Sequence, residues 1–131
     1  MAERCQHIIA RKGLSMAVDA SITESSGVGL LEVSLIGIVS MADKDICRDI
    51  YRLFCEHRSG IVVICIDRLM LFDGAAAKLV LMLARRAMVN INILHLVVGT
   101  GTVRERALQI GFGNVARFHD SYDGFLSRNL G

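Results

Sequence analysis

The chain has 131 residues, 53% hydrophobic and 21% charged, which is enough apolar material for one sizeable core. Its net charge is only +2, and the basic residues are interspersed with acidic ones. The sequence therefore shows no basic patch of the kind that binds nucleic acid or an anionic membrane. Four scattered cysteines lack metal-ligand spacing, and neither a signal peptide nor a membrane-spanning run is evident. We therefore expect a cytoplasmic protein with reduced thiols, no metal and no cofactor.

The first part of the chain is predicted to enter a sheet after a short leader. Residues 1–13 show little pattern and are expected to be loosely ordered, with one domain over residues 14–131. Strands are predicted over residues 14–22 and 30–39, joined by a turn rich in Ser and Gly. Because this connection is short, the first strand is expected to pair antiparallel.

A helix follows, with a recognisable start. Ser40 and Asp43 are spaced as in a capping box. Beyond them Ile46, Ile50 and Phe54 recur at helical spacing, with charged side chains on the other faces. This pattern predicts an amphipathic helix whose charged face is solvated.

The second half alternates strands and helices. Residues 61–66 are apolar throughout and β-branched except for Cys65, which predicts a central strand buried on both faces. The remaining predictions are a helix from Asp73 to about residue 88, a strand over residues 89–98, a helix capped by Thr102 and Glu105, a strand over residues 115–118, and a last helix capped near Ser121.

This alternation predicts the α/β class. Each connection from residue 30 onward has room for a crossover helix, so we expect a mostly parallel sheet of about five strands with an antiparallel first strand, and about four helices.

The helix after Asp73 is the most informative element for function. Polar side chains are few from residue 75 to residue 88 and form one narrow stripe, so the helix is apolar over more surface than docking on a sheet requires. The preceding loop adds four large apolar residues. Together they predict either a partner-binding patch or an ordinary buried helix with a tucked loop. The candidate residues are Leu69, Met70, Leu71, Phe72, Asp73, Gly74, Ala75 and Lys78.

Asp73 also has a simpler interpretation. A carboxylate at the start of a helix can accept a hydrogen bond from a free backbone N–H and interacts favourably with the helix dipole. Capping alone is therefore a sufficient reason for an aspartate here.

The segment from residue 33 to residue 126 resembles the STAS family, the fold of anti-sigma factor antagonists. The similarity rests on the order of four short motifs. They are Val33-Ser34-Leu35-Ile36-Gly37-Ile38, the run Ile64-Cys65-Ile66-Asp67-Arg68-Leu69-Met70-Leu71-Phe72-Asp73, then Ala107-Leu108-Gln109-Ile110-Gly111-Phe112, and Phe118-His119-Asp120-Ser121-Tyr122-Asp123.

The resemblance implies a non-enzymatic regulatory module that docks an anti-sigma factor or related signalling protein around Asp73. In regulated members of the family the loop reads Asp-Ser-Ser-Gly, and the first serine is phosphorylated. Here Gly74 stands at the acceptor position. The resemblance therefore implies that Asp73 is equivalent to the family's aspartate, but that the phosphorylation switch is missing. Cys65 and Asp67 are two further departures from the family pattern.

Alternatives remain open at this point. The same fold serves as an accessory subunit of transporters or signalling scaffolds, and pairing with a second copy of the chain is compatible with the sequence. A third alternative is nucleotide binding at Gly99-Thr100-Gly101, although Arg104 replaces the third glycine of a dinucleotide fingerprint. The histidines form no catalytic set, and His95 is expected to be a core residue with a satisfied hydrogen bond.

Overall fold

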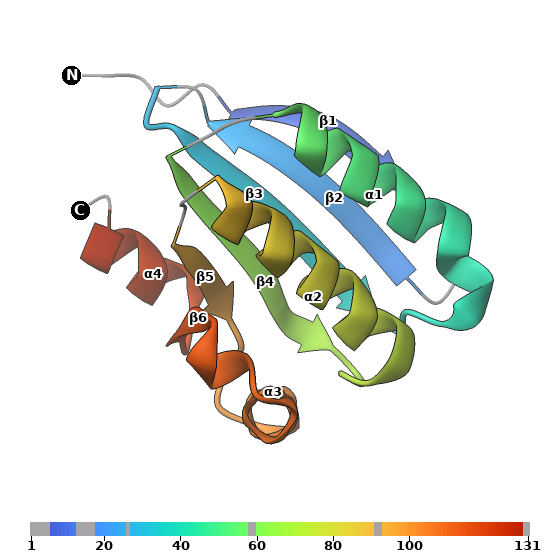
Figure 1. Cartoon of the computed structure of the whole chain (residues 1–131). Helices are drawn as coiled ribbons and strands as arrows, with labels where there is room; N and C mark the ends of the chain where they lie inside the picture. The colour runs from blue at the N-terminus through green and yellow to red at the C-terminus, as the bar shows by residue number, and fades with distance from the viewer. Residues whose placement is uncertain (1–5, 13–17, 26, 58–59, 91–92, 130–131) are drawn as a thin grey trace.

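In the computed structural model, one twisted sheet carries helices on both of its faces (Figure 1). The structure describes residues 6–12, 18–25, 27–57, 60–90 and 93–129, and within these ranges six strands lie side by side in chain order. The strands are β1 (Gln6–Lys12), β2 (Val18–Ser25), β3 (Leu30–Gly37), β4 (Ile61–Leu69), β5 (Leu94–Val97) and β6 (Ala116–His119). The helices are α1 (Lys44–Glu56), α2 (Gly74–Val89), α3 (Thr102–Ile110) and α4 (Tyr122–Asn129), with 3-10 turns η1 (Met41–Asp43) and η2 (Phe112–Asn114).

Strand direction follows from the connections. β1 pairs antiparallel with β2, and β2 with β3. The pairs β3–β4, β4–β5 and β5–β6 are parallel, because α1, α2 and α3 carry the chain back across the sheet between them. The predicted α/β class with a mostly parallel sheet is therefore confirmed.

The leader predicted over residues 1–13 needs a correction in its second half. Gln6–Lys12 form β1, which pairs with β2 from Gln6 opposite Ser25 to Lys12 opposite Ala20. The sheet thus has one strand more than expected. β1 lies at the edge of the sheet and pairs with one strand, β2.

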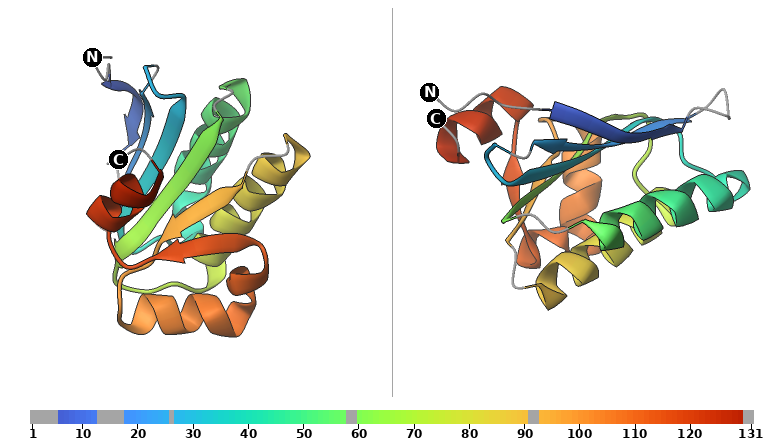
Figure 2. Two further views of the ribbon diagram at one scale, coloured as in Figure 1. Left: turned by 90° about the vertical axis from the view of Figure 1, so that its left-hand side faces the viewer. Right: turned by 90° about the horizontal axis from the view of Figure 1, so that it is seen from above.

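β4 is the central strand, and its side chains supply both layers of the core. Val62, Ile64 and Ile66 belong to the larger apolar cluster, which α1 and α2 cover. Val63 and Cys65 point to the opposite face, where Phe125 of α4 completes a smaller cluster. Figure 2 shows α1 and α2 on one side of the sheet and α4 on the other. The prediction that this strand is buried on both faces is confirmed.

Of the side-chain caps predicted at Ser40, Thr102 and Ser121, the first and the last form and the one at Thr102 does not. Ser40 and Asp43 make the expected capping box, at the start of η1 rather than of α1 itself. The Ser121 hydroxyl accepts a hydrogen bond from the backbone N–H of Gly124 at 3.0 Å. The capping box predicted at Thr102 is wrong: Gly101 occupies the N-cap position of α3 and Thr102 is already helical.

None of the helices in the described ranges is long and apolar enough to cross a membrane.

Candidate partner-binding site

The candidate site begins where β4 ends. Strand pairing continues to Leu69, and the backbone N–H of Met70 donates to the Gly37 carbonyl at 2.8 Å. The chain then turns toward α2, with buried residues at both ends of the turn and exposed ones between them. Leu69 and Phe72 are buried, whereas Met70 and Leu71 are 70% and 54% exposed. Two apolar anchors thus hold a loop that presents two other apolar side chains to solvent.

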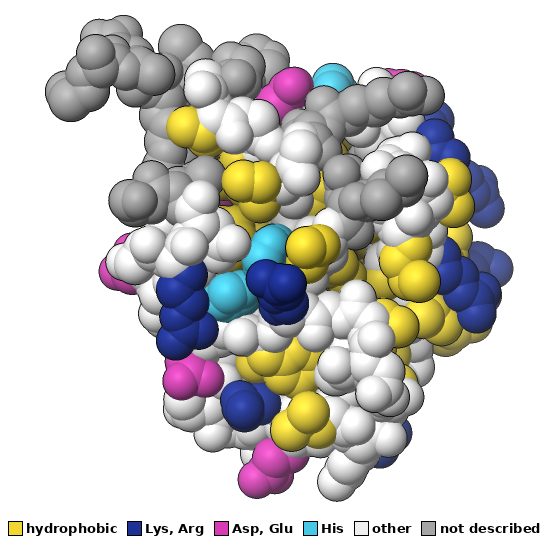
Figure 3. All heavy atoms as spheres, turned by 60° about the vertical axis from the view of Figure 1, so that its left-hand side comes forward, with side chains coloured by type: hydrophobic (Ala, Val, Ile, Leu, Met, Phe, Trp, Pro, Cys, Tyr) yellow, Lys and Arg dark blue, Asp and Glu magenta, His cyan; other side chains and the backbone are white. Residues whose placement is uncertain are grey.

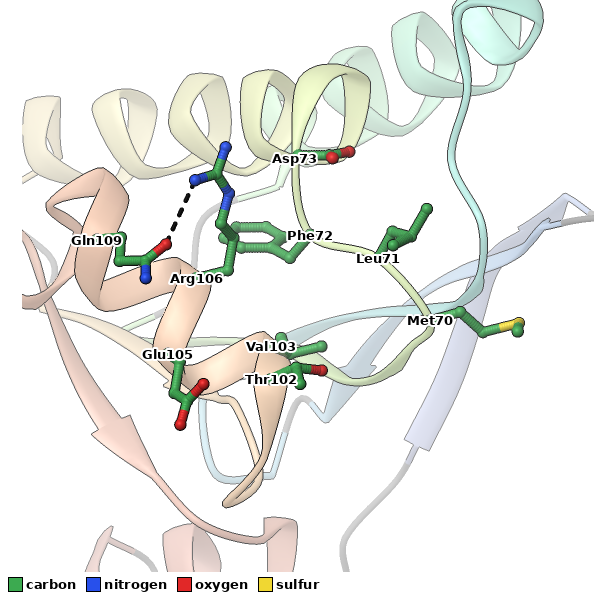
Figure 4. Close-up of a pocket in the computed structure, with 9 residues that line it drawn as sticks. All are labelled: Met70, Leu71, Phe72, Asp73, Thr102, Val103, Glu105, Arg106 and Gln109. Atoms are coloured by element: carbon green, nitrogen blue, oxygen red, sulfur yellow. Dashed lines mark hydrogen bonds between the residues drawn. The ribbon is translucent and has the colours of Figure 1, made fainter.

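Asp73 occupies the N-cap position of α2 in extended conformation, but its carboxylate makes no capping hydrogen bond. Its backbone carbonyl begins the helix instead, accepting from the N–H of Ala76 at 3.1 Å and of Ala77 at 3.3 Å. The interpretation of this side chain as a helix cap is therefore wrong. In Figure 4 the carboxylate points away from α3. It is exposed and available for contact.

Gly74 opens α2 with a φ of +46°, in the left-handed region. A Cβ at this position would meet no other atom within 4 Å, so space for a Cβ does not require glycine; the backbone conformation does. The sharp turn lets the chain leave β4 at Leu69 and enter α2 at Gly74.

A hollow of about 250 Å³ lies between this loop and α3 (Figure 4). Residues 70–73 form one wall and α3 the other. Arg106 extends from α3 toward α2, and its guanidinium donates to Gln109 Oε1 at 3.4 Å. The α3 side of the hollow consists of Thr102, Val103, Glu105, Arg106 and Gln109.

The α3 wall was not among the predicted site residues. The signal that could have indicated it is topological: β4 and β5 are parallel neighbours, so the segments that follow them emerge at the same edge of the sheet. The loop after β4 must then lie beside the start of α3.

α2 leaves part of its apolar surface uncovered, which favours the first of the two interpretations that the sequence left open. Its buried face includes Leu79 and Leu83, while Leu81, Met82, Met88 and Val89 remain exposed. α4 cannot cover them, because it packs on the opposite side of the sheet (Figure 2). Figure 3 shows hydrophobic side chains reaching the surface beside Lys and Arg side chains. Of the two other candidates on α2, Lys78 is exposed and Ala75 half-buried.

The predicted site residues thus divide into two groups. Leu69 and Phe72 lie in the core and position the loop. The other candidates reach the surface at the start of α2, namely Met70, Leu71, Asp73, Gly74, Ala75 and Lys78.

The Gly99–Gly101 segment is a turn between β5 and α3. Gly99 has a φ of +73°, and a Cβ there would lie 3.4 Å from the Cβ of Asp67. The positive φ accounts for this glycine without a phosphate, because the Asp67 contact is an ordinary van der Waals distance.

His95 is buried and hydrogen-bonded, as predicted, and its partner is His119. Nδ1 of His95 lies 2.9 Å from Nε2 of His119, and the Phe125 ring packs against both imidazoles. Burial is the main reason that the pKa of each histidine lies below its ordinary value; that of His95 falls to about 4. Across the described residues, no three His, Cys, Asp or Glu side chains are grouped to hold a metal.

Comparison with known proteins shows the fold alone. No family model matches the sequence, and no curated protein does. Among solved structures, the chain is similar to an anti-sigma factor antagonist from Mycobacterium paratuberculosis, with a TM-score of 0.73 and 11% identity over 88% of this chain and 96% of that one. It is also similar to the unphosphorylated anti-sigma factor antagonist SpoIIAA, with a TM-score of 0.61 and 15% identity over 93% and 95% of the two chains. The STAS fold implied by the sequence motifs is therefore confirmed.

Proposed function

We propose that this chain is a non-enzymatic, cytoplasmic regulatory module that binds an anti-sigma factor or a related signalling protein through the loop and helix start around Asp73. The observation that carries the proposal is the exposure of Met70 and Leu71 beside a carboxylate that makes no hydrogen bond within the helix start. Exposed apolar side chains next to an available charge are typical of a protein-binding surface.

Three features support this proposal. The loop is anchored by Leu69 and Phe72 in the core, so a partner would meet a preformed surface at low entropic cost. The C-terminal helix packs on the far side of the sheet and leaves the loop open. The two solved structures described above are those of anti-sigma factor antagonists, which agrees with a partner of this class.

The proposed module works without the serine switch. Position 74 is glycine, and the sequence holds no Ser, Thr or Tyr between residues 60 and 99. Phosphorylation within the loop or α2 would need a hydroxyl that the segment lacks.

The test is a matched pair of substitutions on exposed leucines. Leu71→Asp places a charge in the proposed interface, and Leu108→Asp makes the same change on α3 at 50% exposure against 54%. Both variants should keep the wild-type free energy of unfolding within about 0.5 kcal/mol. We expect the tagged wild-type and Leu108→Asp proteins to retain an anti-sigma factor or related signalling protein from the native host, and Leu71→Asp to lose it. Equal retention by Leu71→Asp would refute docking at the loop.

A further inference from the structure

A second depression lies between the two helices that share one face of the sheet. α1 and α2 run side by side there (Figures 1 and 2) and leave an open groove of about 290 Å³ near their N-terminal turns. Leu79, which is 2% exposed, forms part of its floor. Met41, Cys47, Tyr51 and Met82 line the rest together with Ala75. The groove is distinct from the hollow beside α3 but begins at the same helix start.

The charged residues that line this groove have one sign. Lys44 and Arg48 come from α1 and Lys78 from α2, and no acidic residue is among those that line it. Asp45 approaches Arg48 at 3.7 Å, but its side chain is 92% exposed, so this ion pair is solvated and weak. α2 itself contains no Asp or Glu along its whole length. The groove therefore combines an apolar floor with a cationic rim.

Shape and composition favour a helix as the occupant. From Ala75 to Met82 the groove follows about two turns of α2, roughly 10 Å, which is the span of anchors at i, i+3 or i+4, and i+7 on a docked helix. Its volume lies at the low end of the range for pockets that enclose drug-sized ligands, which favours a protein segment over a small molecule as the occupant. Met41 and Met82 supply adaptable apolar walls of the kind that accept helical segments.

We propose that the α1–α2 groove binds an acidic amphipathic helix of the partner, with apolar side chains over Leu79 and carboxylates facing Lys44, Arg48 and Lys78. This inference rests on the proposed function, because it names the partner element that continues from the loop into the groove. Charge complementarity at the rim would govern the rate of association and the choice of partner more than the total affinity.

Photo-crosslinking locates the partner segment. A photoreactive phenylalanine derivative is placed in the native host at Met82 in the groove, at Met70 in the loop, or at Leu108 on α3 as the control. We expect the same partner to be crosslinked from the first two positions and not from the third. The peptide joined to position 82 should be acidic, with apolar residues at helical spacing.

Charge reversal then tests the rim. Lys78→Glu lies in the groove, whereas Arg85→Glu makes the same change on an exposed position of the same helix outside it. The probes are the crosslinked partner and a synthetic peptide of its mapped segment. Lys78→Glu should slow the association of both probes at low salt by about tenfold or more, and Arg85→Glu by less than about twofold. Replacing the peptide's Asp and Glu by Asn and Gln should remove this difference.

The outcomes separate this inference from the proposed function. A crosslink at position 70 with none at 82, a neutral or basic segment at 82, or equal effects of Lys78→Glu and Arg85→Glu would overturn the groove proposal and leave loop docking intact. A crosslink at 82 with none at 70, combined with normal binding by Leu71→Asp, would overturn loop docking and leave the groove. Absence of a crosslink at both positions would overturn both.

Discussion

The rings of Phe72 and Phe112 pack against each other with their centroids 5.4 Å apart and their planes at 51°. Phe72 belongs to the loop after β4, and Phe112 lies in η2 directly after α3. Both are buried in the larger core cluster. This contact joins the two walls of the hollow at the candidate site, so the position of the binding loop depends on the core beneath it.

Truncating Phe72 should therefore cost stability. We expect Phe72→Ala to lower the free energy of unfolding by about 3–5 kcal/mol, because it removes a buried ring and leaves a cavity. Phe72→Leu should cost less, since most of the apolar volume remains. The measurement is urea unfolding, with Met70→Ala, at a 70% exposed position, as a control that should change stability by no more than about 0.5 kcal/mol. A small effect of Phe72→Ala would contradict the anchoring role.

Restoring a hydroxyl at position 74 should also be unfavourable. Gly74 has a φ of +46°, and a residue with a Cβ pays roughly 1–2 kcal/mol in this conformation. We expect Gly74→Ser and Gly74→Ala to be destabilised by similar amounts, because the strain comes from the Cβ that both variants add, and this Cβ meets no atom within 4 Å. Gly60→Ser, at a glycine with open space and no positive φ, is the control. Equal stability of Gly74→Ser and the wild type would show that the turn relaxes.

Much of the fold follows from local patterns in the sequence. The unbroken apolar run of β4 and the helical spacing of Ile46, Ile50 and Phe54 each depend on burial, and burial follows hydrophobicity. The capping box at Ser40 formed because its two side chains satisfy each other's backbone N–H groups. The box expected at Thr102 failed because Gly101 ends the preceding turn and takes the cap position, a choice that the spacing of Thr and Glu alone does not determine.

Of the two walls of the candidate site, only the loop before α2 could be predicted from the sequence, and the α3 wall could not. The loop from residue 69 to residue 74 stands out by its apolar content, but sequence does not tell which of its side chains face inward. The structure buries Leu69 and Phe72 and exposes Met70 and Leu71. The contribution of α3 and the pairing of His95 with His119, which are 24 residues apart, arise from the order of the strands in the sheet. These are long-range relationships that local patterns do not encode.

The cysteines should differ sharply in reactivity. Cys65 is 8% exposed, and burial first, then the charges of Glu32 and Asp67, raises the pKa of its thiol. Cys47 is half-buried, and its pKa is raised by partial burial and then by Asp43. Because thiolates are the reactive form, iodoacetamide should alkylate Cys47 slowly and faster as pH rises, while Cys65 stays unmodified in the native protein.

Mass spectrometry of a Cys5→Ser variant, with and without urea, measures these rates without interference from the N-terminal thiol. Cys65 should react only when the chain unfolds. Alkylation of native Cys65 at the rate of Cys47 would contradict the burial of the β4 side chain under α4. The same experiment in the presence of the partner should slow the reaction at Cys47, which lines the α1–α2 groove.

The pair of His95 and His119 should make the protein less stable in mild acid. In the folded chain, burial first and then the neighbouring His119 and Arg117 lower the pKa of His95 from 6.5 to about 4. The pKa of His119 is also lowered, by burial, Arg128 and Arg117, with Asp120 opposing. Between these pH values the unfolded chain binds more protons than the folded one, so the free energy of unfolding should fall as pH drops from about 6.5 to about 4.

Chemical unfolding at a series of pH values tests this slope. The control is the double variant in which both His95 and His119 are replaced by Leu. It removes both titrating groups at once, so no buried imidazole is left without its hydrogen-bond partner. Its stability should change less over the same pH interval, and α4 should stay docked because Phe125 keeps its apolar neighbours Val63 and Val97. If the wild type and the double variant lose stability in parallel, the acid sensitivity originates in the carboxylates elsewhere in the chain and not in the buried imidazoles.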